Sequence, residues 1–240
     1  MNGLALIALD AEATFLTRPD GRITAENEPT PAPAPRMFLA GSADGNLLRL
    51  RDDVDPGAAR EIERLVADEP PLAAPEAQPC FLPRYRELLD GAEPQFGLSF
   101  ELPHGLAPAA EAEFVYSGAP AGEALMARFQ AEGMPPQLAA NGFGDVDEFW
   151  APWCLAQIEG EAAAIAFAAR LGPKGAALGL VTFPQFRGRG LGAAVTAAWT
   201  RHPELSTRRL FYGCSRENLS SRRVVERLGL RFIGPTLRLV

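Results

Sequence analysis

The chain has 240 residues, 47% of them hydrophobic, and a formal net charge of −7 at pH 7. This length allows one large domain or two small ones, and the apolar content is enough for a sizeable core. An acidic chain excludes a nucleic-acid binder that relies on overall positive charge.

The charge is divided unequally along the chain. Residues 151–240 hold thirteen Lys and Arg against five Glu, a net +8, so residues 1–150 carry −15. A basic half suits an anionic cofactor, and an acidic half facing it would suit a cationic acceptor such as an amine. The alternative interpretation is that the acidic surface only keeps the protein soluble.

The cysteines and the N-terminus indicate the compartment. Cys80, Cys154 and Cys214 are far apart and form no CxxC motif, so we expect free thiols in a reducing environment. With two histidines in the whole chain, no metal site is expected. The N-terminal segment has no basic start and carries an early Asp10, unlike a secretory signal, and no apolar run approaches the ~20 residues of a membrane span. The sequence therefore predicts a cytoplasmic protein without a membrane partner.

The first 110 residues contain short strand patterns separated by turns. Two hairpins are expected from the strands Leu4–Leu9, Thr14–Thr17, Arg22–Ala25, Met37–Ala40 and Leu47–Arg51. A helix is expected to begin after Asp55, because Asp55 can cap it, Pro56 fits its first turn and apolar residues follow at helical spacing through Ala67. Beyond a proline-rich break we expect a short helix at Phe81–Leu89 and a strand at Gln95–Leu102.

From residue 110 onward the order is strand, helices and hairpin. The pattern predicts a strand at Glu113–Tyr116, helical segments at Gly122–Glu132, Gln137–Asn141 and Val146–Trp150, and a hairpin of Trp153–Glu159 with Ala162–Arg170. Phe149, Trp150 and Trp153 could line a substrate pocket, although a packed aromatic cluster is the default interpretation.

A glycine-rich turn follows the next strand. The apolar run Ala176–Phe183 has the length of a buried strand, Pro184 ends it, and a helix is expected over Ala193–Thr200. Between them, Gln185–Gly192 alternates glycines with arginines. Glycines let several N–H groups point the same way, the helix N-terminus adds partial positive charge, and the arginines add full charges. The stretch predicts a pyrophosphate site; the alternative is a solvated turn that only starts a helix.

A second pattern completes the chain. Arg209–Ser215 predicts a strand, and Asn218 opens a helix that ends at Gly229-Leu230. The last residues predict a closing hairpin of Arg231–Gly234 and Thr236–Val240.

These two patterns resemble the GCN5-related N-acetyltransferase (GNAT) superfamily. Gln185-x-x-Gly188-x-Gly190 is similar to the acyl-CoA signature of that family, and the helix opened by Asn218 is similar to its second motif. The resemblance is firm over roughly residues 150–240. It implies an α/β (α+β) fold, with a mixed, mostly antiparallel twisted sheet flanked by helices.

The resemblance also implies a division of the chain. A GNAT domain is expected at residues 111–240, preceded by an N-terminal extension at residues 1–110 that helps to shape the acceptor site. This combination resembles a bacterial group of GNAT proteins with such an extension. The strand–helix pair at Leu47–Ala67 leaves open a degenerate duplicated half-domain, although no residue-level repeat is visible.

The cofactor and its contacts follow from the same resemblance. The protein would transfer acetyl from acetyl-CoA, without a metal, to a primary amine of a small molecule or peptide; a homodimer stays open. The strand before the turn would pair with the pantetheine arm, and the turn would hold the pyrophosphate. The implied cofactor-binding residues are Leu180, Val181, Thr182, Arg187, Gly188, Arg189, Gly190, Leu191, Gly192, Ala193 and Asn218. Arg222 and Arg223 could reach the 3′-phosphate or could form a solvated face.

The usual catalytic positions of the family are altered. Many GNAT enzymes carry a Tyr acid seven residues after the motif Asn, and some carry a Glu base on the preceding strand; here these positions hold Val225 and Gly213. Substitutes for the acid, each of which could instead be structural, are Tyr212, Cys214, Ser215 and Ser221. A base could come, through water, from Glu148, Glu159 or Glu161.

Two other functions remain as alternatives. Loss of the acid and the base would fit a catalytically inactive coenzyme A-binding module that serves regulation or assembly. Gly188-x-Gly190-x-x-Ala193 also satisfies a dinucleotide-binding pattern. However, Phe183–Arg187 separates the strand from the first glycine, and the next strand carries no acidic residue.

Overall fold

The computed structural model describes residues 1–29 and 32–240. Its strands are β1 (Phe15–Thr17), β2 (Ile23–Glu26), β3 (Met37–Ser42), β4 (Gly45–Leu50), β5 (Pro94–Leu102), β6 (Glu113–Tyr116), β7 (Trp153–Ile158), β8 (Glu161–Leu171), β9 (Gly175–Thr182), β10 (Arg209–Ser215) and β11 (Arg231–Leu239). Its α-helices are α1 (Gly3–Thr14), α2 (Pro56–Ala67), α3 (Leu82–Leu88), α4 (Pro120–Glu132), α5 (Pro136–Ala139), α6 (Leu191–Trp199) and α7 (Leu219–Leu228). Short 3-10 turns are η1 (Val146–Glu148), η2 (Pro184–Phe186) and η3 (Pro203–Leu205).

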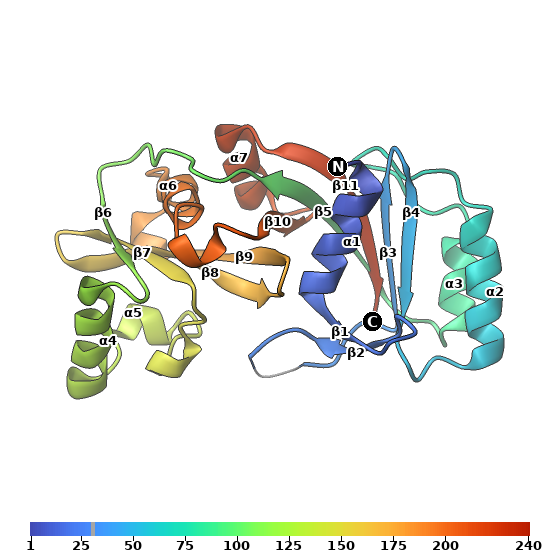
Figure 1. The fold of residues 1–240 in the computed structure, drawn as a ribbon, viewed down its shortest axis with the longest axis horizontal. Coiled ribbons are helices and arrows are strands. Elements are labelled where there is room, and N and C mark those ends of the chain that lie inside the picture. Colours follow the sequence, from blue (N-terminus) through green and yellow to red (C-terminus); the bar gives the residue numbers. More distant parts are fainter. Residues whose placement is uncertain (30–31) are drawn as a thin grey trace.

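A nine-stranded sheet runs along most of the molecule, from β6 to β4 (Figure 1). Its strand order is β4-β3-β11-β5-β10-β9-β8-β7-β6, and β1 and β2 form a separate two-stranded sheet. Within the described residues, β9 and β10 pair in parallel, whereas the other neighbours in the large sheet are antiparallel. The predicted mixed, mostly antiparallel sheet flanked by helices is therefore confirmed.

The N-terminal segment is a helix where the sequence predicted a strand at Leu4–Leu9. Asn2 begins α1, because its side-chain oxygen accepts a hydrogen bond from the N–H of Ala5 at 3.0 Å. Leu6 is buried in a cluster with Phe211 of β10. Because apolar residues lie on several sides of α1, neither a helical nor a strand period stands out in this stretch. The first strand of the expected hairpin is thus wrong, while β1 and β2 do pair.

β5 lies between β10 and β11, although it comes from the first half of the chain (Figure 1). Phe100 of β5 is paired with Tyr212 on one side and with Phe232 on the other. The predicted closing hairpin is wrong, because β11 is one strand that pairs with β5 along its length and with β3 from Thr236 onward. The division at residue 110 stays a prediction.

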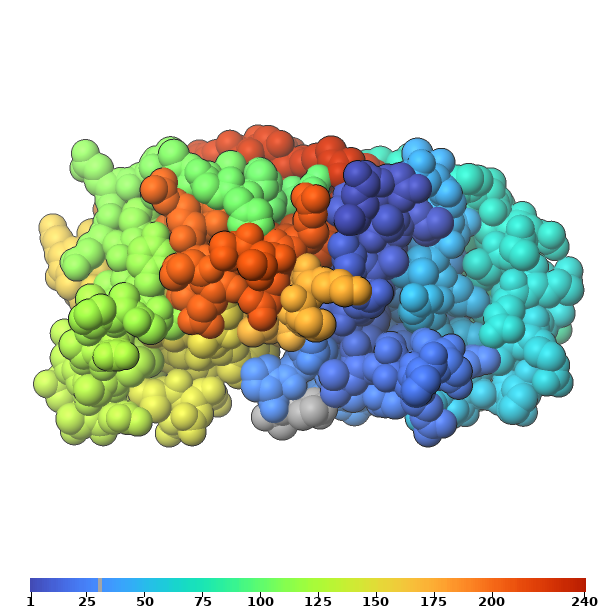
Figure 2. Space-filling model, viewed as in Figure 1, coloured from blue at the N-terminus to red at the C-terminus, as the bar shows by residue number. Residues whose placement is uncertain are grey.

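Helices cover both faces of the sheet, and successive residues of β10 pack against the helices of opposite faces. Leu210 and Tyr212 belong to the large core that includes residues of α6 and α7, whereas Phe211 packs with residues of α1. The pair α2–α3 lies beyond β4 at one end of the molecule, and α4 and α5 lie at the other (Figure 1). Figure 2 shows α1 exposed along one side beside the strands of the N-terminal part. In the described ranges, no helix has both the length and the apolar character that a bilayer crossing requires.

The parallel pair β9–β10 separates after three residues. Pairing runs from Arg209↔Gly175 to Phe211↔Ala177 and then stops, although both strands continue. Beyond this point β9 stays paired with β8 as far as Thr182, and β10 stays paired with β5. The separation leaves a wedge between two central strands, and the candidate site is at this wedge.

Candidate functional site

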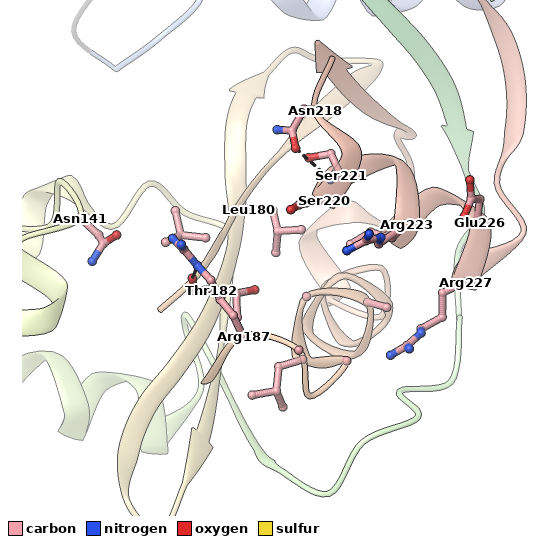
Figure 3. A pocket seen from close by; sticks show the side chains of 17 residues that line it. Asn141, Leu180, Thr182, Arg187, Asn218, Ser220, Ser221, Arg223, Glu226 and Arg227 are labelled. Atoms are coloured by element: carbon pink, nitrogen blue, oxygen red, sulfur yellow. Dashed lines mark hydrogen bonds between the residues drawn. The ribbon is translucent and has the colours of Figure 1, made fainter. Parts of the chain in front are cut away.

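A cavity of about 1130 Å³ lies where β9, α6 and α7 meet (Figure 3). Its lining residues are Asn141, Leu180, Val181, Thr182, Arg187, Gly188, Gly190, Leu191, Gly192, Ala193, Asn218, Ser220, Ser221, Arg223, Val224, Glu226 and Arg227. The structure thus brings together every cofactor-binding residue implied by the sequence except Arg189. The Arg189 guanidinium lies over the ring of Phe186 instead, 5.6 Å from its centroid. That these residues bind a cofactor stays a prediction.

The glycine-rich turn presents a row of free backbone donors to this cavity. Gly188 and Gly190 have φ of +79° and +80°, a conformation that L side chains rarely adopt. α6 starts at Leu191 without a side-chain cap. Among the described residues, no protein acceptor takes the N–H groups from Gly188 to Ala193. Together with the helix dipole, such a row of donors suits a polyanionic group.

Three arginines give the cavity a positive charge. Nε of Arg187 donates a hydrogen bond to the carbonyl oxygen of Thr182 at 3.2 Å, which holds this side chain over β9. Arg223 and Arg227 are one helical turn apart on α7 and both line the cavity (Figure 3). Glu226 is the acidic member of the lining. Of the two arginines considered for a 3′-phosphate, Arg223 lines the cavity, whereas Arg222 does not.

Beyond Ala177, the edge of β9 that faces the wedge has no strand partner within residues 1–29 and 32–240. The Thr182 carbonyl accepts from Arg187 rather than from β8, while the next residue, Phe183, donates to Ala163 of β8 at 3.1 Å. Because backbone groups of a strand alternate in direction, Leu180 directs its N–H and C=O to the same side as Thr182. This side is the one from which β10 has moved away.

Asn218 has a structural role that is visible directly. It caps α7, since its side-chain oxygen accepts a hydrogen bond from the N–H of Ser221 at 3.0 Å (Figure 3). It also lines the cavity, so a cap and a ligand contact are compatible at this position.

The four acid candidates are not equivalent in the structure. Tyr212 is buried, and burial raises its pKa to about 12, opposed by a hydrogen bond with Ser221. Burial also raises the pKa of Cys214, which lies on the same face of β10. The Ser215 hydroxyl donates to Glu217 at 2.9 Å and faces the other way. Ser221 is the member of this set that lines the cavity.

The three base candidates lie outside the cavity lining. Glu148 accepts backbone hydrogen bonds from Gly144 and Asp145 in a capping box at η1. Glu159 occupies a turn position with φ of +51°, and Glu161 starts β8. The structure therefore assigns Glu148 a local structural contact, and none of the three belongs to the lining.

The aromatic residues near the predicted substrate pocket form a packed cluster. Phe149 and Trp153 are buried, with ring centroids 5.6 Å apart. Trp150 meets the edge of Phe167 at 5.9 Å, and Phe167 covers Gly179 of β9 so closely that a side chain there would collide with it.

Sequence reasoning missed several residues of the lining. These are Asn141, Ser220, Val224, Glu226 and Arg227. A signal for Arg227 was present, because it lies four residues after Arg223 and so shares its helix face. Asn141 precedes the wedge by a long stretch of chain, and no local pattern connects the two. Among the described residues, no group of three or more His, Cys, Asp or Glu could hold a metal ion.

Comparison with known proteins points to one family. Residues 124–231 match the family model for an acetyltransferase (GNAT) domain. A comparison with curated protein sequences gives no significant match.

Several solved structures are similar to the chain at low sequence identity. A GNAT-family protein from Novosphingobium aromaticivorans DSM 12444 has 19% identity and a TM-score of 0.44, over 61% of this chain and 64% of that chain. The chain thus spans just under two thirds of that protein. An acetyltransferase of the GNAT family from Colwellia psychrerythraea has 14% identity and a TM-score of 0.46, over 99% and 95% of the two chains. A GCN5-related N-acetyltransferase from Kribbella flavida has 17% identity and a TM-score of 0.43, over 86% and 89%.

Proposed function

We propose that this chain, whose residues 124–231 match the family model for an acetyltransferase (GNAT) domain, transfers an acetyl group from acetyl-CoA to a primary amine. The observation that carries the proposal is the row of N–H groups from Gly188 to Ala193, beside three arginines, at the mouth of the wedge between β9 and β10. Such a site fits a diphosphate joined to a long, thin arm that enters between the strands.

The residues present fit the phosphate groups and the pantetheine arm of coenzyme A. The N–H groups of the glycine-rich turn would hold the pyrophosphate, while Arg187, Arg223 and Arg227 would neutralise phosphate charge. The backbone groups of Leu180 and the N–H of Thr182, which face the wedge, would pair with the amide groups of the pantetheine arm. When bound, the cofactor supplies an acyl group activated as a thioester.

The chain would contribute to acyl transfer mainly by positioning and by backbone electrostatics. The N–H of Leu180 is directed into the wedge and can donate to an oxygen that gains negative charge. Ser221 lines the cavity, and its hydroxyl can donate a hydrogen bond to the departing sulfur. The Tyr212 phenol is buried and does not belong to the cavity lining, so it is less well placed for this contact than Ser221.

Calorimetry with acetyl-CoA tests the binding half of the proposal. A variant that combines Arg187→Gln, Arg223→Gln and Arg227→Gln should raise the dissociation constant at least ~100-fold, because each charged hydrogen bond contributes about 1.5–3 kcal/mol. The matched control is Arg60→Gln, which removes an exposed arginine of α2 and should leave binding unchanged. Equal affinity in all three proteins, or no binding by the wild type, would contradict the proposal.

A thiol-release assay over a panel of primary amines tests the catalytic half. Turnover with any amine would exclude the alternative of an inactive coenzyme A-binding module. Tight binding of acetyl-CoA without turnover of any amine would favour that alternative instead.

A further inference from the structure

Asp10 of α1 is a carboxylate that the site described above does not use. Its Oδ2 accepts a hydrogen bond from the hydroxyl of Ser99 on β5 at 2.7 Å. Protein atoms crowd around it, yet the residue keeps part of its surface accessible. Within the described residues, no cation forms an ion pair with Asp10, so an enclosed carboxylate has one neutral hydrogen-bond donor as its partner.

The contact with Ser99 places Asp10 beside the wedge. Ser99 is paired with Gly213 of β10, two residues beyond Phe211, at which the pairing of β9 and β10 ends. The Ser99–Gly213 pair is therefore about 7 Å along β10 from Phe211, where the two strands separate. Ser99 itself is one strand, about 5 Å, to the side of β10. Asp10 thus lies over the strands that border the wedge.

Asp10 lies on the face of the sheet opposite α6 and α7, the helices that carry most of the cavity lining. Phe211 packs with α1, and Gly213, two residues later, shares that face. Tyr212 and Leu180 face α6 and α7, with the cavity. The donor and the acceptor can therefore reach the wedge from two different sides.

The α1 face is open at this position. A Cβ built on Gly213 would meet no heavy atom within 4 Å, and both Gly213 and Ser215 are exposed. At Gly213, β10 therefore has no side chain that would fill the space beside Asp10. An acceptor group of modest size can approach the wedge here, next to the carboxylate.

We propose that Asp10 receives the acceptor amine at the wedge between β9 and β10 and acts as its general base, from the face opposite the cofactor cavity. This inference rests on the proposed acetyl transfer. It assigns to the N-terminal helix the group that β10 lacks at Gly213.

The chemistry balances with Asp10 as the proton acceptor. The ionised carboxylate attracts the ammonium form of the acceptor and takes one proton from it. The freed nitrogen forms a bond to the acyl carbon, the C–S bond of the thioester breaks, and the second nitrogen proton passes to the departing sulfur. Asp10 then releases its proton to solvent. The sum is an ammonium ion plus a thioester giving an amide, a thiol and one proton.

The surroundings of Asp10 suit this role. Burial raises its pKa to about 6, against which the Ser99 hydrogen bond acts, so the carboxylate is more basic than usual and still ionised above neutral pH. Of the strands packed against α1, β1, β3 and β9 carry no ionisable side chain. Arg170 of β8 and Arg238 of β11 pair with Glu26, and Arg231 pairs with Glu101. The remaining charged residues on α1, β4 and β8 are Glu12, Arg49 and Glu161.

The test compares Asp10→Asn with Glu12→Gln, which removes an exposed carboxylate from the same helix. Acetyl-CoA affinity is measured by calorimetry, and kcat/KM is measured from pH 5 to 9 with an amine selected from the panel. Asp10→Asn should lower kcat/KM by about 100-fold or more and abolish the acid limb near pH 6, with acetyl-CoA affinity unchanged. Glu12→Gln should leave both the rate and the profile as in the wild type.

A second variant separates a catalytic role from a structural one. Ser99→Ala removes the hydrogen bond that lowers the pKa of Asp10, so the acid limb should move to higher pH while the rate at pH 9 is retained. An unchanged profile in both variants would overturn the inference, as would a wild type that binds acetyl-CoA and acetylates no amine. Failure of the wild type to bind acetyl-CoA would instead overturn the proposed function itself.

Discussion

Replacing Asp10 with Asn should stabilise the folded protein above pH 6. Burial raises the pKa of Asp10 from 3.8 to about 6, so the folded state resists ionisation of this carboxyl more than the unfolded chain does. An Asn side chain is neutral and keeps an oxygen that can accept the 2.7 Å hydrogen bond from Ser99. The substitution therefore removes the cost of the buried charge and keeps the contact.

The size and the pH window follow from the shift. Two pKa units correspond to about 3 kcal/mol at most, because one unit is about 1.36 kcal/mol. Below pH 3.8 the carboxyl is protonated in both states, and the wild type loses nothing. Between pH 3.8 and about 6 the folded state binds more protons than the unfolded state, so stability falls as the pH rises, and above pH 6 the full loss is present.

Urea unfolding at half-unit steps from pH 4 to 8 measures this difference. The free energy of unfolding of Asp10→Asn minus that of the wild type should grow through this window and then level off. Glu12→Gln serves as the control for loss of a negative charge on the same helix, and it should show no such growth. Parallel curves for Asp10→Asn and the wild type would refute the claim that this carboxyl is held in a desolvated site.

Three other predictions concern the turn, the cap of α7 and the thiols. Gly188→Ala and Gly133→Ala each place a side chain at a similar positive φ, with no atom nearby. Urea unfolding should therefore show a similar loss of about 1 kcal/mol in the unfolding free energy of both variants. Calorimetry should show weaker acetyl-CoA binding for Gly188→Ala and unchanged binding for Gly133→Ala. Asn218→Ala should lower the unfolding free energy by about 1 kcal/mol, since it removes the cap; equal stability would contradict the role of the 3.0 Å hydrogen bond to Ser221. Burial raises the pKa of Cys154 to about 12, so iodoacetamide at pH 8 should spare it until urea unfolds the protein, which peptide mass spectrometry can follow.

The parts of the site that depend on single residues could be predicted from the sequence. Gly188 and Gly190 adopt positive φ, which favours glycine, and Asn218 is a typical capping residue. Each of these residue types therefore predicts its own local structure. These features place the turn and the start of α7 without knowledge of the rest of the chain.

Features that depend on distant contacts could not be predicted. The segment Leu4–Leu9, expected to be a strand, is part of the helix α1. Its apolar residues lie on several sides of this helix, so the sequence shows neither a helical nor a strand period there. The turn expected at Gly234-Pro235 is the middle of β11, since the ladder with β3 begins only at Thr236 and Pro235 need not donate to it. Nothing near Asp10 in the sequence indicates that Ser99 would lie beside it.

The position of β5 has a consequence for any attempt to shorten the chain. A fragment that starts at residue 111 would lack the strand that joins β10 to β11, and the hydrogen-bonding groups on the facing edges of both would be left to water. β11 would then have no neighbouring strand in the fragment. β10, which forms one side of the wedge, would lose its partner on the other side. The opening segment is thus inseparable from the half of the chain that carries the candidate site, and trimming it is expected to cause misfolding or aggregation rather than to yield a smaller folded domain.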